Sequence, residues 1–525
     1  MSRKGELFKN TIIISIGKIS TQFISFLLVP LYTSQVTVSD YGYIDLVQTY
    51  VSLLIPIIIL RFDSAVFRFL IDVRKQFQKQ IRIISTVVLI IILELLLIIS
   101  ASFLIHQWFE IRFFYAILLN IICLAGSQIA LQVSRGIGSN ISYAIGSIIS
   151  ALTNITCSFL FVYTLKMGGE GILLSSSIAN LICILYLFFS NKIYQKISIK
   201  SFDKHTLSQM LKYSLPMIPD GISWWIINTS DRTIISMMIS MAANGFYAIS
   251  SKFSNILMSV FQIFSMSWQE NAAVHMNDED ADAYFSEIID DMFRIFYSIC
   301  LLLLSSMYII FKIFVDPNYN EAYMYIPILL ISNVFNSIAS AIGSIYTAKK
   351  ETLKVAKTTI TAAIINIITH VSLVRIIGIY AAAVSTLLSC IYIMLYRLID
   401  IRKYVKIKLD KKLYILSSFA FLFLVVIYYS DNLFLQTIGL LLAVVIVYLL
   451  NRKATQKIFS LTKNLVSSSM LAVGINKTFF PFVSLFIKSL NISFTPVKYE
   501  HKNRFFIALT SPFYFILLLF KFYIY

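Results

Sequence analysis

Four basic side chains lie inside apolar segments that are long enough to cross a membrane: Lys18, Arg61, Arg232 and Lys252. A cation near the middle of a bilayer costs roughly 2.5 to 3.5 kcal/mol or more, so it is usually kept where it faces an anion or a water-filled cavity. We therefore interpret these four side chains as candidate contacts for an acidic cargo that crosses a membrane.

Helical spacing places further polar residues beside two of these cations. Gln22 follows Lys18 by four residues, and Asn255 follows Lys252 by three, so each pair lies on one helix face. Neither lysine has an acidic residue at these spacings to neutralise it. Arg61 is the weaker candidate, because a long basic side chain near the inner end of a span can reach the lipid headgroups.

Carboxylates in the same segments leave two interpretations open. Lys18 could pair with Asp220, since both are expected about 10 to 12 Å from the inner ends of their helices. Arg232, next to Asp231, could anchor the outer end of its helix instead of contacting cargo. The predicted set of cavity residues is Lys18, Gln22, Arg61, Asp63, Asp220, Asp231, Arg232, Lys252 and Asn255.

The sequence contains no pattern typical of an enzyme. It has no phosphate-binding glycine loop, no serine triad motif and no histidine spacing suited to a metal, so we predict no catalytic residue, metal or cofactor. The five cysteines all lie in apolar segments, which argues against disulfides. The net charge of +18 is explained by membrane orientation and anionic lipid, so nucleic-acid binding is not expected.

The elements that position these residues are predicted to be membrane helices. The chain of 525 residues is 58% hydrophobic and 13% charged, with a mean hydropathy of +0.80, which excludes an ordinary soluble protein. Apolar runs of about 20 residues recur along it, the length that crosses a bilayer core. We predict fourteen spans, at residues 10–33, 43–67, 83–105, 113–134, 142–164, 171–190, 213–238, 244–269, 290–314, 323–347, 355–374, 378–397, 412–429 and 433–450.

Basic residues concentrate in alternate connections. Residues 68–82, 192–212, 349–357 and 397–412 are rich in lysine and arginine, whereas the connections on the opposite side carry few. Cytoplasmic loops carry this excess, so both ends of the fourteen-helix unit, including the N-terminus, are predicted to be cytoplasmic.

The chain also repeats itself with an offset of 203 residues, between residues 10–50 and 213–253. Because each repeat holds six spans, the two lobes are expected to be related by a pseudo-two-fold axis along the membrane normal, with a cavity between them. The predicted fold is therefore an all-α integral membrane protein of two six-helix lobes plus two additional helices. The predicted domains are an N-terminal lobe (1–195), a basic cytoplasmic linker (196–212), a C-terminal lobe (213–400), two additional helices (401–452) and a C-terminal tail (453–525).

Several short motifs resemble oligosaccharide flippases of the Wzx type, which belong to the multidrug, oligosaccharidyl-lipid and polysaccharide exporter (MOP) superfamily. In the first half they are Asn10-Thr11, Gly17, Leu31-Tyr32-Thr33, Asp40-Tyr41-Gly42 and Arg68-Phe69. In the second half they are Tyr213 to Pro219, Asn228 to Arg232, Asn244-Gly245-Phe246-Tyr247, Ser251-Lys252 and Trp268. The resemblance covers residues 1 to about 450 and leaves the tail outside it.

The resemblance implies a transporter rather than an enzyme. Its expected substrate is an undecaprenyl-pyrophosphate-linked oligosaccharide, moved from the cytoplasmic to the outer leaflet of a bacterial inner membrane for O-antigen or capsule assembly. It also implies partners in the same pathway, namely a polymerase and a chain-length regulator, together with anionic lipids. In related lipid II flippases, basic residues of the first, second and eighth helices serve the pyrophosphate, and Lys18, Arg61 and Lys252 occupy comparable helices here.

Two other classes of function remain open from the sequence. A drug or cation antiporter of the same superfamily would be expected to carry acidic residues in its first helix, where this chain has Lys18. A membrane polysaccharide polymerase or ligase would be expected to carry a long outside loop with charged residues. The outside connections here are mostly under about a dozen residues, which is short for such a loop.

Overall fold

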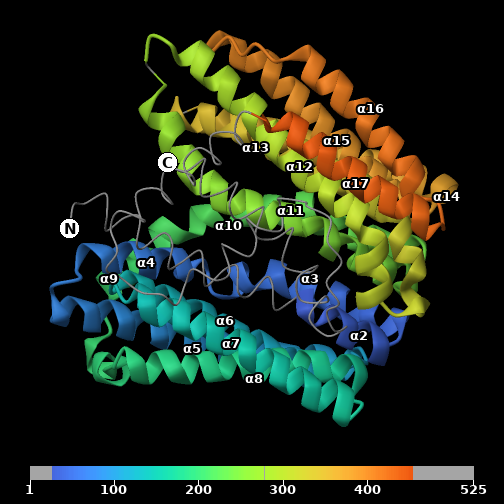
Figure 1. The fold of residues 1–525 in the computed structure, drawn as a ribbon. Coiled ribbons are helices and arrows are strands. Elements are labelled where there is room, and N and C mark those ends of the chain that lie inside the picture. The colour runs from blue at the N-terminus through green and yellow to red at the C-terminus, as the bar shows by residue number, and fades with distance from the viewer. Residues whose placement is uncertain (1–25, 277, 350, 453–525) are drawn as a thin grey trace, which may run out of the picture. The chain divides into compact units, whose positions relative to one another are not determined.

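The computed structural model describes residues 26–276, 278–349 and 351–452, and within them it contains only helices and their connections (Figure 1). The first half of the chain forms α2 (Val29–Gln35), α3 (Val38–Ile58), α4 (Phe62–Asp72), α5 (Phe77–Trp108), α6 (Phe114–Gly136), α7 (Asn140–Ser158) with its π-helical continuation η1 (Phe159–Thr164), and α8 (Gly168–Ser190). A connection then holds the 3-10 helices η2 (Ile193–Lys196) and η3 (Ile199–Ser201), followed by α9 (Lys204–Ser214).

The second half begins with a 3-10 turn, η4 (Leu215–Met217), that leads directly into a helix. Its elements are α10 (Ile218–Met238), α11 (Met241–Val274), α12 (Ala281–Phe314), η5 (Pro317–Tyr325), α13 (Ile326–Ala348), α14 (Thr352–Ile377), α15 (Tyr380–Asp400), η6 (Ile401–Lys403), α16 (Lys411–Tyr428) and α17 (Leu433–Leu450). Every predicted span from 43–67 onward therefore corresponds to helix, and the all-α class is confirmed. The first predicted span, 10–33, lies outside the described residues except for its end, part of which is in α2.

The lipid-facing character of the helices confirms a multi-pass membrane protein. Among the described residues, eleven helices are long and apolar enough to cross a membrane. In the most apolar 18-residue stretch of α5, only 6% of the residues are buried inside the protein, and Leu93, Leu97 and Leu104 are each more than half exposed. A stretch of helix that is apolar on all sides and uncovered by protein fits a lipid environment.

The second predicted span, 43–67, is wrong as a single helix, because the structure divides it into α3 and α4. Pro56 lacks the N–H that would continue the helical hydrogen bonds, and α3 ends two residues later at Ile58. The chain then turns through Leu60 and Arg61, which have φ values of 45° and 55°. Such left-handed values are uncommon for residues other than glycine, so the break is a defined feature of this chain.

The repeat is visible in two matching turns. Thr37 caps α3 by accepting a hydrogen bond from the Asp40 N–H, and Ser240 caps α11 by accepting one from the Ala243 N–H. The two caps are separated by the 203-residue offset found in the sequence, and hydroxyl caps of this kind satisfy the free N–H groups of the first helical turn. The lobe boundaries at 195, 213 and 400 remain a prediction.

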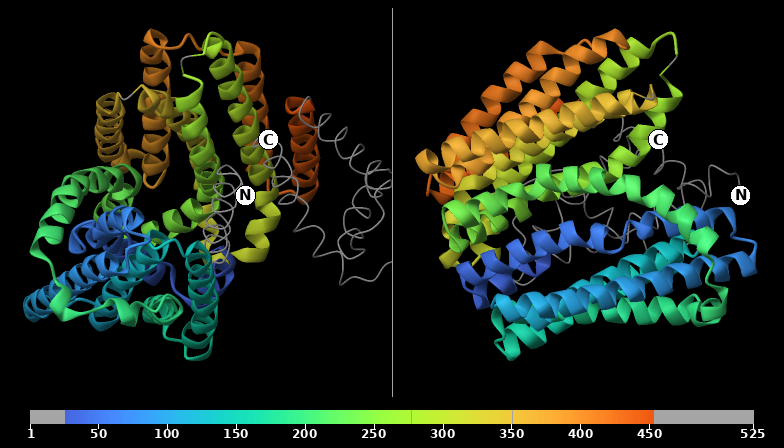
Figure 2. Two further views of the ribbon diagram at one scale, coloured as in Figure 1. Left: turned by 90° about the vertical axis from the view of Figure 1, so that its left-hand side faces the viewer. Right: turned by 180° about the vertical axis from the view of Figure 1, so that it is seen from behind.

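Each lobe has its own apolar core. Ile55, Phe62, Leu70 and Ile84 belong to a cluster that joins α3, α4 and α5 with α6 and α9. In the second lobe, α13 lies against α11 and α15, and α10 lies against α14 (Figure 2). Helix α3 also lies against both α10 and α11, so the two lobes meet along these three helices (Figure 1).

Residues 291–306 of α12 form a separate compact unit with residues 411–452. Within it, the Tyr297 hydroxyl donates to the Ser417 carbonyl, and the Asn451 side chain donates to the Ser298 hydroxyl at 2.8 Å. The aromatic rings of Phe293 and Tyr414 lie 4.2 Å apart, centre to centre. The two additional helices are therefore held to the middle of α12 by both polar and aromatic contacts.

Candidate functional site

The two lobes approach most closely where α3 crosses α11. A side-chain carbon added to Gly42 would lie 1.9 Å from the carbonyl oxygen of Met241, and one added to Gly245 would lie 2.2 Å from that of Val38. Only glycine allows backbones to pass at such distances. The Asn244 side chain donates to the Gly42 carbonyl at 2.8 Å and reinforces the crossing. We call the contacts around residues 36–50 and 225–247 the closed end.

A buried ion pair joins the lobes at this closed end. The Arg232 Nε donates to the Asp45 carboxylate at 2.8 Å, and the two side chains are only 12% and 17% exposed. The Arg232 guanidinium also lies over the ring of Tyr247, 5.8 Å from its centre. Removing one partner of a buried pair leaves an uncompensated charge, which typically costs about 3 to 5 kcal/mol. The pair is therefore a strong constraint on how α3 and α10 meet.

Two further hydrogen bonds cross between the lobes within about two turns of the ion pair. Tyr50 and Thr233 join their hydroxyl groups at 3.1 Å, and the Trp225 indole N–H donates to the Thr49 carbonyl at 2.7 Å. These contacts lie on the same stretch of α3 and α10 as the ion pair. The closed end thus combines a glycine crossing, a salt bridge and direct hydrogen bonds.

Asp231, next to Arg232, lies in a saturated hydrogen-bonding environment inside the second lobe. The Tyr247 hydroxyl donates to it at 2.9 Å, the Thr386 hydroxyl at 3.0 Å, and the His370 Nδ1 lies 3.0 Å from its other oxygen. The Asn366 amide, in its consistent orientation, adds a fourth donor at 3.3 Å. We call Asp231, Tyr247, His370, Thr386 and Asn366 the Asp231 cluster.

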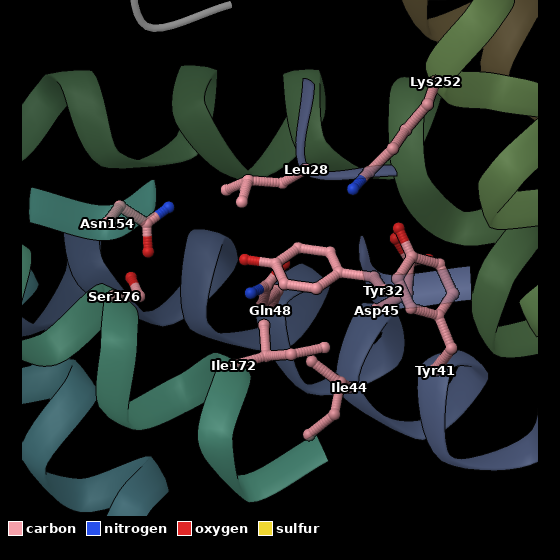
Figure 3. Close-up of a pocket in the computed structure, with 10 residues that line it drawn as sticks. All are labelled: Leu28, Tyr32, Tyr41, Ile44, Asp45, Gln48, Asn154, Ile172, Ser176 and Lys252. Carbon is pink, nitrogen blue, oxygen red and sulfur yellow. The ribbon is translucent and has the colours of Figure 1, made fainter. Parts of the chain in front are cut away.

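Lys252 extends from α11 of the second lobe into a polar cavity of the first lobe (Figure 3). Its ammonium lies 5.2 Å from the centre of the Tyr41 ring and 5.6 Å from that of Tyr32. Aromatic faces attract cations within about 6 Å. No ion pair joins Lys252 to a carboxylate among the residues that the structure describes. Lys252 is therefore available to bind an anion.

The cavity around Lys252 has a mixed wall and a volume of about 90 Å³. This is room for a few water molecules. Its lining residues are Leu28, Tyr32, Tyr41, Ile44, Asp45, Gln48, Asn154, Ile172, Ser176 and Lys252. The amides of Gln48 and Asn154 and the hydroxyl of Ser176 supply further donors in the cavity wall, with Asn154 and Ser176 at the opposite side from Lys252 (Figure 3). A larger anionic group would fit only after the cavity opens.

Arg61 is not part of this neighbourhood. It lies in the break between α3 and α4, where its guanidinium contacts the Ser64 hydroxyl at 3.3 Å and the Asp63 carboxylate at 3.9 Å. Arg61 follows Asp45 by sixteen residues, about 24 Å along a helix. The predicted residues Arg61 and Asp63 thus form a second polar group near the other end of α3.

The remaining predicted residues divide into three groups. Lys18 and Gln22 lie outside the described residues, and so does the Asp220 side chain. Asn255 is exposed one turn beyond Lys252, where its carbonyl accepts from Ser259. Arg232 and Lys252 are brought together near Asp45, and the bond from Arg232 to Asp45 joins the lobes; the anchoring role of Arg232 stays a prediction.

Sequence reasoning missed Asp45 and His370 as site residues. Asp45 lies 187 residues from its partner Arg232, and His370 lies 139 residues from Asp231. Local spacing cannot show such contacts. The available signal was chemical: each is an ionisable residue inside an apolar segment, which is costly unless it is paired.

Comparison with known proteins supports the same architecture. The family model described as polysaccharide biosynthesis protein matches residues 7–269. Among curated proteins, none matches the sequence. The fold is similar to an inward-facing multidrug resistance MATE family transporter of the MOP superfamily (TM-score 0.63, 11% identity, covering 74% of this chain and 98% of that one). It is also similar to the lipid II flippase MurJ in an inward closed conformation (TM-score 0.60, 18% identity, covering 86% of this chain and 100% of that one).

Proposed function

Because the chain belongs to the polysaccharide biosynthesis protein family, whose model spans half of it, we propose that it is a flippase for lipid-linked oligosaccharides. Its substrate is a polyprenyl pyrophosphate that carries a sugar repeat unit. The protein moves this lipid from the cytoplasmic to the outer leaflet of a bacterial inner membrane by alternating access. The surface polymer built from it is O-antigen or capsule.

The observation that carries this proposal is Lys252. Its ammonium lies in a polar cavity where the lobes meet, beside aromatic rings and amides and without an ion-pair partner among the described residues. A cation held inside the membrane in this way suits a mobile anion better than a structural role. The pyrophosphate is the anionic part of the proposed substrate, and charge-assisted hydrogen bonds from a lysine suit it well.

The asymmetry of the lobe contacts supports alternating access. The hydrogen bonds and the ion pair described above all lie at the closed end, around residues 36–50 and 225–247. The basic connections at residues 68–82 and 192–212 lie at the opposite ends of the helices. The positive-inside rule makes that opposite end cytoplasmic. The closed end then faces outward, and the structure represents a state that is sealed on the outer side.

In this mechanism the cations act in order. Lys18, which the sequence predicts in the inner half of the first span, receives the pyrophosphate from the cytoplasmic side, and Gln22, Asp220 and Arg61 are the other predicted residues of this path. Lys252 meets it when the closed end separates. Because the cell interior is negative, outward movement of an anion gains about 2.3 kcal/mol per charge per 100 mV. The membrane potential therefore favours the proposed direction.

The short outer connections argue against a polymerase or ligase. Among the described residues, α2 and α3 are joined by two residues, as are α10 and α11, and α14 and α15. A catalytic site for sugar polymerisation would need a longer loop or several charged groups on that side. Asp45 lines the Lys252 cavity and would suit a transported cation, but Arg232 already neutralises it. The cation antiporter is accordingly the weaker alternative.

Complementation of a flippase-deficient strain tests the proposal. Wild-type protein is expected to restore surface polysaccharide, and a variant with Lys18→Gln and Lys252→Gln is expected to leave lipid-linked repeat units in the inner leaflet. Lys79→Gln, an exposed lysine in the first turn of α5, is the matched control and should behave as wild type.

Three results would contradict this assignment. Normal transport by the double lysine variant would remove the two lysines from the anion path. Normal translocation with altered polymer length would favour a polymerase. Failure of the wild-type protein to rescue strains with several different repeat units would favour the antiporter.

A further inference from the structure

The two lobes differ in one connection that occupies corresponding places in the two repeats. In the first lobe, residues 109–113 join α5 to α6. In the second lobe, the longer segment 315–325 joins α12 to α13 and contains η5. Both segments reach the region where α2 turns into α3, but they bind it from different lobes.

The connection in the first lobe contacts its own lobe. The Arg112 guanidinium pairs with the Asp40 carboxylate at 2.6 Å, and the Tyr43 hydroxyl donates to the Arg112 carbonyl at 3.0 Å. At the 203-residue offset, Asp40 and Tyr43 correspond to Ala243 and Phe246, which have neither a carboxylate nor a hydroxyl. The second lobe therefore cannot repeat these side-chain contacts with its own α11.

In the second lobe, η5 contacts the first lobe instead. The Tyr319 hydroxyl donates to the Val36 carbonyl at 2.8 Å, and the Thr33 hydroxyl accepts from the Asp316 N–H at 3.2 Å. The ring of Tyr319 also meets the ring of Tyr41 edge to face, with 6.0 Å between the centres. Helix ends leave their last carbonyls without helical partners, and Tyr319 supplies a partner for Val36, the residue that ends α2. Tyr319 is 0% exposed, so this contact is fully enclosed.

The 3-10 geometry of η5 divides its contacts between the lobes. Residues three apart lie above one another in such a helix, so Tyr319, Ala322 and Tyr325 share one face, and all three are buried. The Ala322 carbonyl accepts from the Ser250 hydroxyl of α11 at 2.6 Å, and the Tyr325 ring lies 4.8 Å from that of Tyr380 on α15. The second half of η5 is thus fixed to its own lobe, while Tyr319 in the first half reaches the other lobe.

Tyr41 connects η5 to the Lys252 cavity. Its ring lines that cavity and lies 5.2 Å from the Lys252 ammonium (Figure 3). The same ring is in contact with Tyr319 and is only 3% exposed. If Tyr319 moves away, Tyr41 loses a neighbour that covers it, and the cavity wall beside Lys252 becomes more accessible.

The contact between η5 and the first lobe is built from neutral groups. Each of its two hydrogen bonds joins a hydroxyl to a backbone group, at Tyr319 and at Thr33. Neutral hydrogen bonds have a small net free energy when water replaces the lost partner. The bond between Arg232 and Asp45 is a buried ion pair and has a larger cost when one partner is lost. The η5 contact is therefore suited to breaking and forming again.

We propose that η5 is a latch between the lobes. Tyr319 holds the turn between α2 and α3 while the outer end is closed, and it leaves that turn when the outer end opens. Because Ala322 stays bonded to α11, η5 moves with the second lobe, whereas residues 109–113 keep their contacts with the first lobe in both states. In the flippase cycle, on whose assignment this consequence rests, release of the latch uncovers Tyr41 and lets the pyrophosphate leave Lys252 outward.

The first experiment measures the distance between the lobes without lipid substrate. Spin labels replace Ser34 of α2 and Asn320 of η5, two exposed residues, after substitution of the five native cysteines. In lipid nanodiscs, Tyr319→Phe should raise the ratio of the longer to the shorter distance about 2- to 10-fold, because the closed state loses one hydrogen bond. Tyr325→Phe is the matched control, since its hydroxyl bonds to Glu321 within η5, and it should leave the ratio unchanged.

The second experiment closes the latch covalently. Thr33→Cys and Asp316→Cys place two thiols where a hydrogen bond now joins the residues, at the end of the molecule assigned to the outer side, where disulfides form. In the complemented strain, the disulfide should stop production of surface polysaccharide, and a reductant should restore it. Each single cysteine variant is a control and should support normal production.

These experiments separate the latch from the flippase assignment. Thr33→Val removes the second hydrogen bond from the other lobe and should shift the distance ratio in the same direction as Tyr319→Phe. Equal ratios in Tyr319→Phe, Tyr325→Phe and the labelled parent protein would overturn the latch, and that measurement uses no lipid cargo. Normal surface polysaccharide with the disulfide fully formed would also overturn it and leave the flippase assignment standing. Failure of the wild-type protein to complement would contradict the flippase assignment alone, and the distance ratio would still decide the latch.

Discussion

The Lys252 cavity and the Asp231 cluster differ in how many partners surround the ionisable side chain. Lys252 has two aromatic rings and a polar cavity around it, and no ion-pair partner in the described part of the chain. Asp231 has donors from Tyr247, Thr386 and His370 and almost no exposure. A side chain that binds and releases a mobile group has few fixed partners, as Lys252 does. A side chain with a structural role has its hydrogen-bonding capacity filled, as Asp231 does.

Because of this difference, we expect the Asp231 cluster to affect the free energy of unfolding and Lys252 to affect the affinity for an anion. A saturated buried charge is part of the folded structure, so its loss should appear mainly as a loss of stability. A cation in a cavity contributes little to the free energy of unfolding and much to the affinity for an anion. Variants of the two regions should therefore have effects on different measurements.

The largest expected effect is that of Arg232→Met, which leaves Asp45 without its partner and removes the positive charge beside Asp231. We expect the free energy of unfolding in detergent to fall by about 3 to 5 kcal/mol. The double variant Asp45→Asn with Arg232→Met should recover part of this loss, because the uncompensated carboxylate is gone. Arg402→Met, an exposed arginine, is the control and should change stability by less than about 0.5 kcal/mol. Equal losses in both arginine variants would contradict the structural role of the pair.

The next largest effect is expected for Lys252→Gln, and on binding rather than stability. Loss of a charge-assisted hydrogen bond costs about 1.5 to 3 kcal/mol, so the affinity for undecaprenyl pyrophosphate should fall about 10- to 100-fold. Titration of the purified protein with that lipid in detergent measures this, with Lys79→Gln as the control. The unfolding free energy should change by less than about 1 kcal/mol. A variant that is strongly destabilised but binds normally would show that Lys252 is structural and would remove the contrast with Asp231.

A smaller effect is expected for Tyr247→Phe, which removes one donor from the Asp231 cluster while the others remain. The free energy of unfolding should fall by about 0.5 to 1.5 kcal/mol. Tyr163→Phe, whose side chain is half exposed, should be neutral in the same thermal unfolding measurement. If Tyr247→Phe were as harmful as Arg232→Met, the donors to Asp231 would act as one unit rather than as separate contributions.

The smallest effect on stability is expected at Asp203, a solvent-exposed carboxylate that can be compared with the buried Asp231. Hydrogen bonds from Thr206, first from its side chain and then from its backbone, hold the pKa of this helix-capping carboxyl below its usual value. A lowered pKa in the folded state gives stabilisation above the usual aspartate pKa, and it is lost as the pH falls through the lowered value. NMR of the labelled carboxyl carbon between about pH 2 and pH 6 measures this. A Thr206→Ala variant should move the pKa back toward its usual value, and an unchanged pKa would contradict the cap.

The sequence predicted the parts of this molecule that depend on local pattern. Apolar runs of membrane length define the helices, because each run is sufficient by itself to require a span. Arg232 and Lys252 were found because charge inside such a run is unusual. The contacts of Asp45 with Arg232 and of Asp231 with His370 join different lobes or distant helices. They depend on how the repeats pack together, which the pattern within one helix does not contain. The break after Pro56 was only partly predictable. The proline is visible in the sequence, but the left-handed turn at Leu60 and Arg61 is not.

That turn has a consequence for protein engineering. Leu60 and Arg61 are consecutive residues with positive φ values of 45° and 55°, each costing of the order of 1 kcal/mol relative to glycine. Replacing Leu60 by glycine should relieve one of these costs and give a more heat-resistant protein for biochemical work. The same replacement at Arg61 should relieve the other but remove the basic group of the α3–α4 break. Heat resistance alone would thus favour glycine at both positions, but at the second position it would be gained only with the loss of a membrane-embedded positive charge.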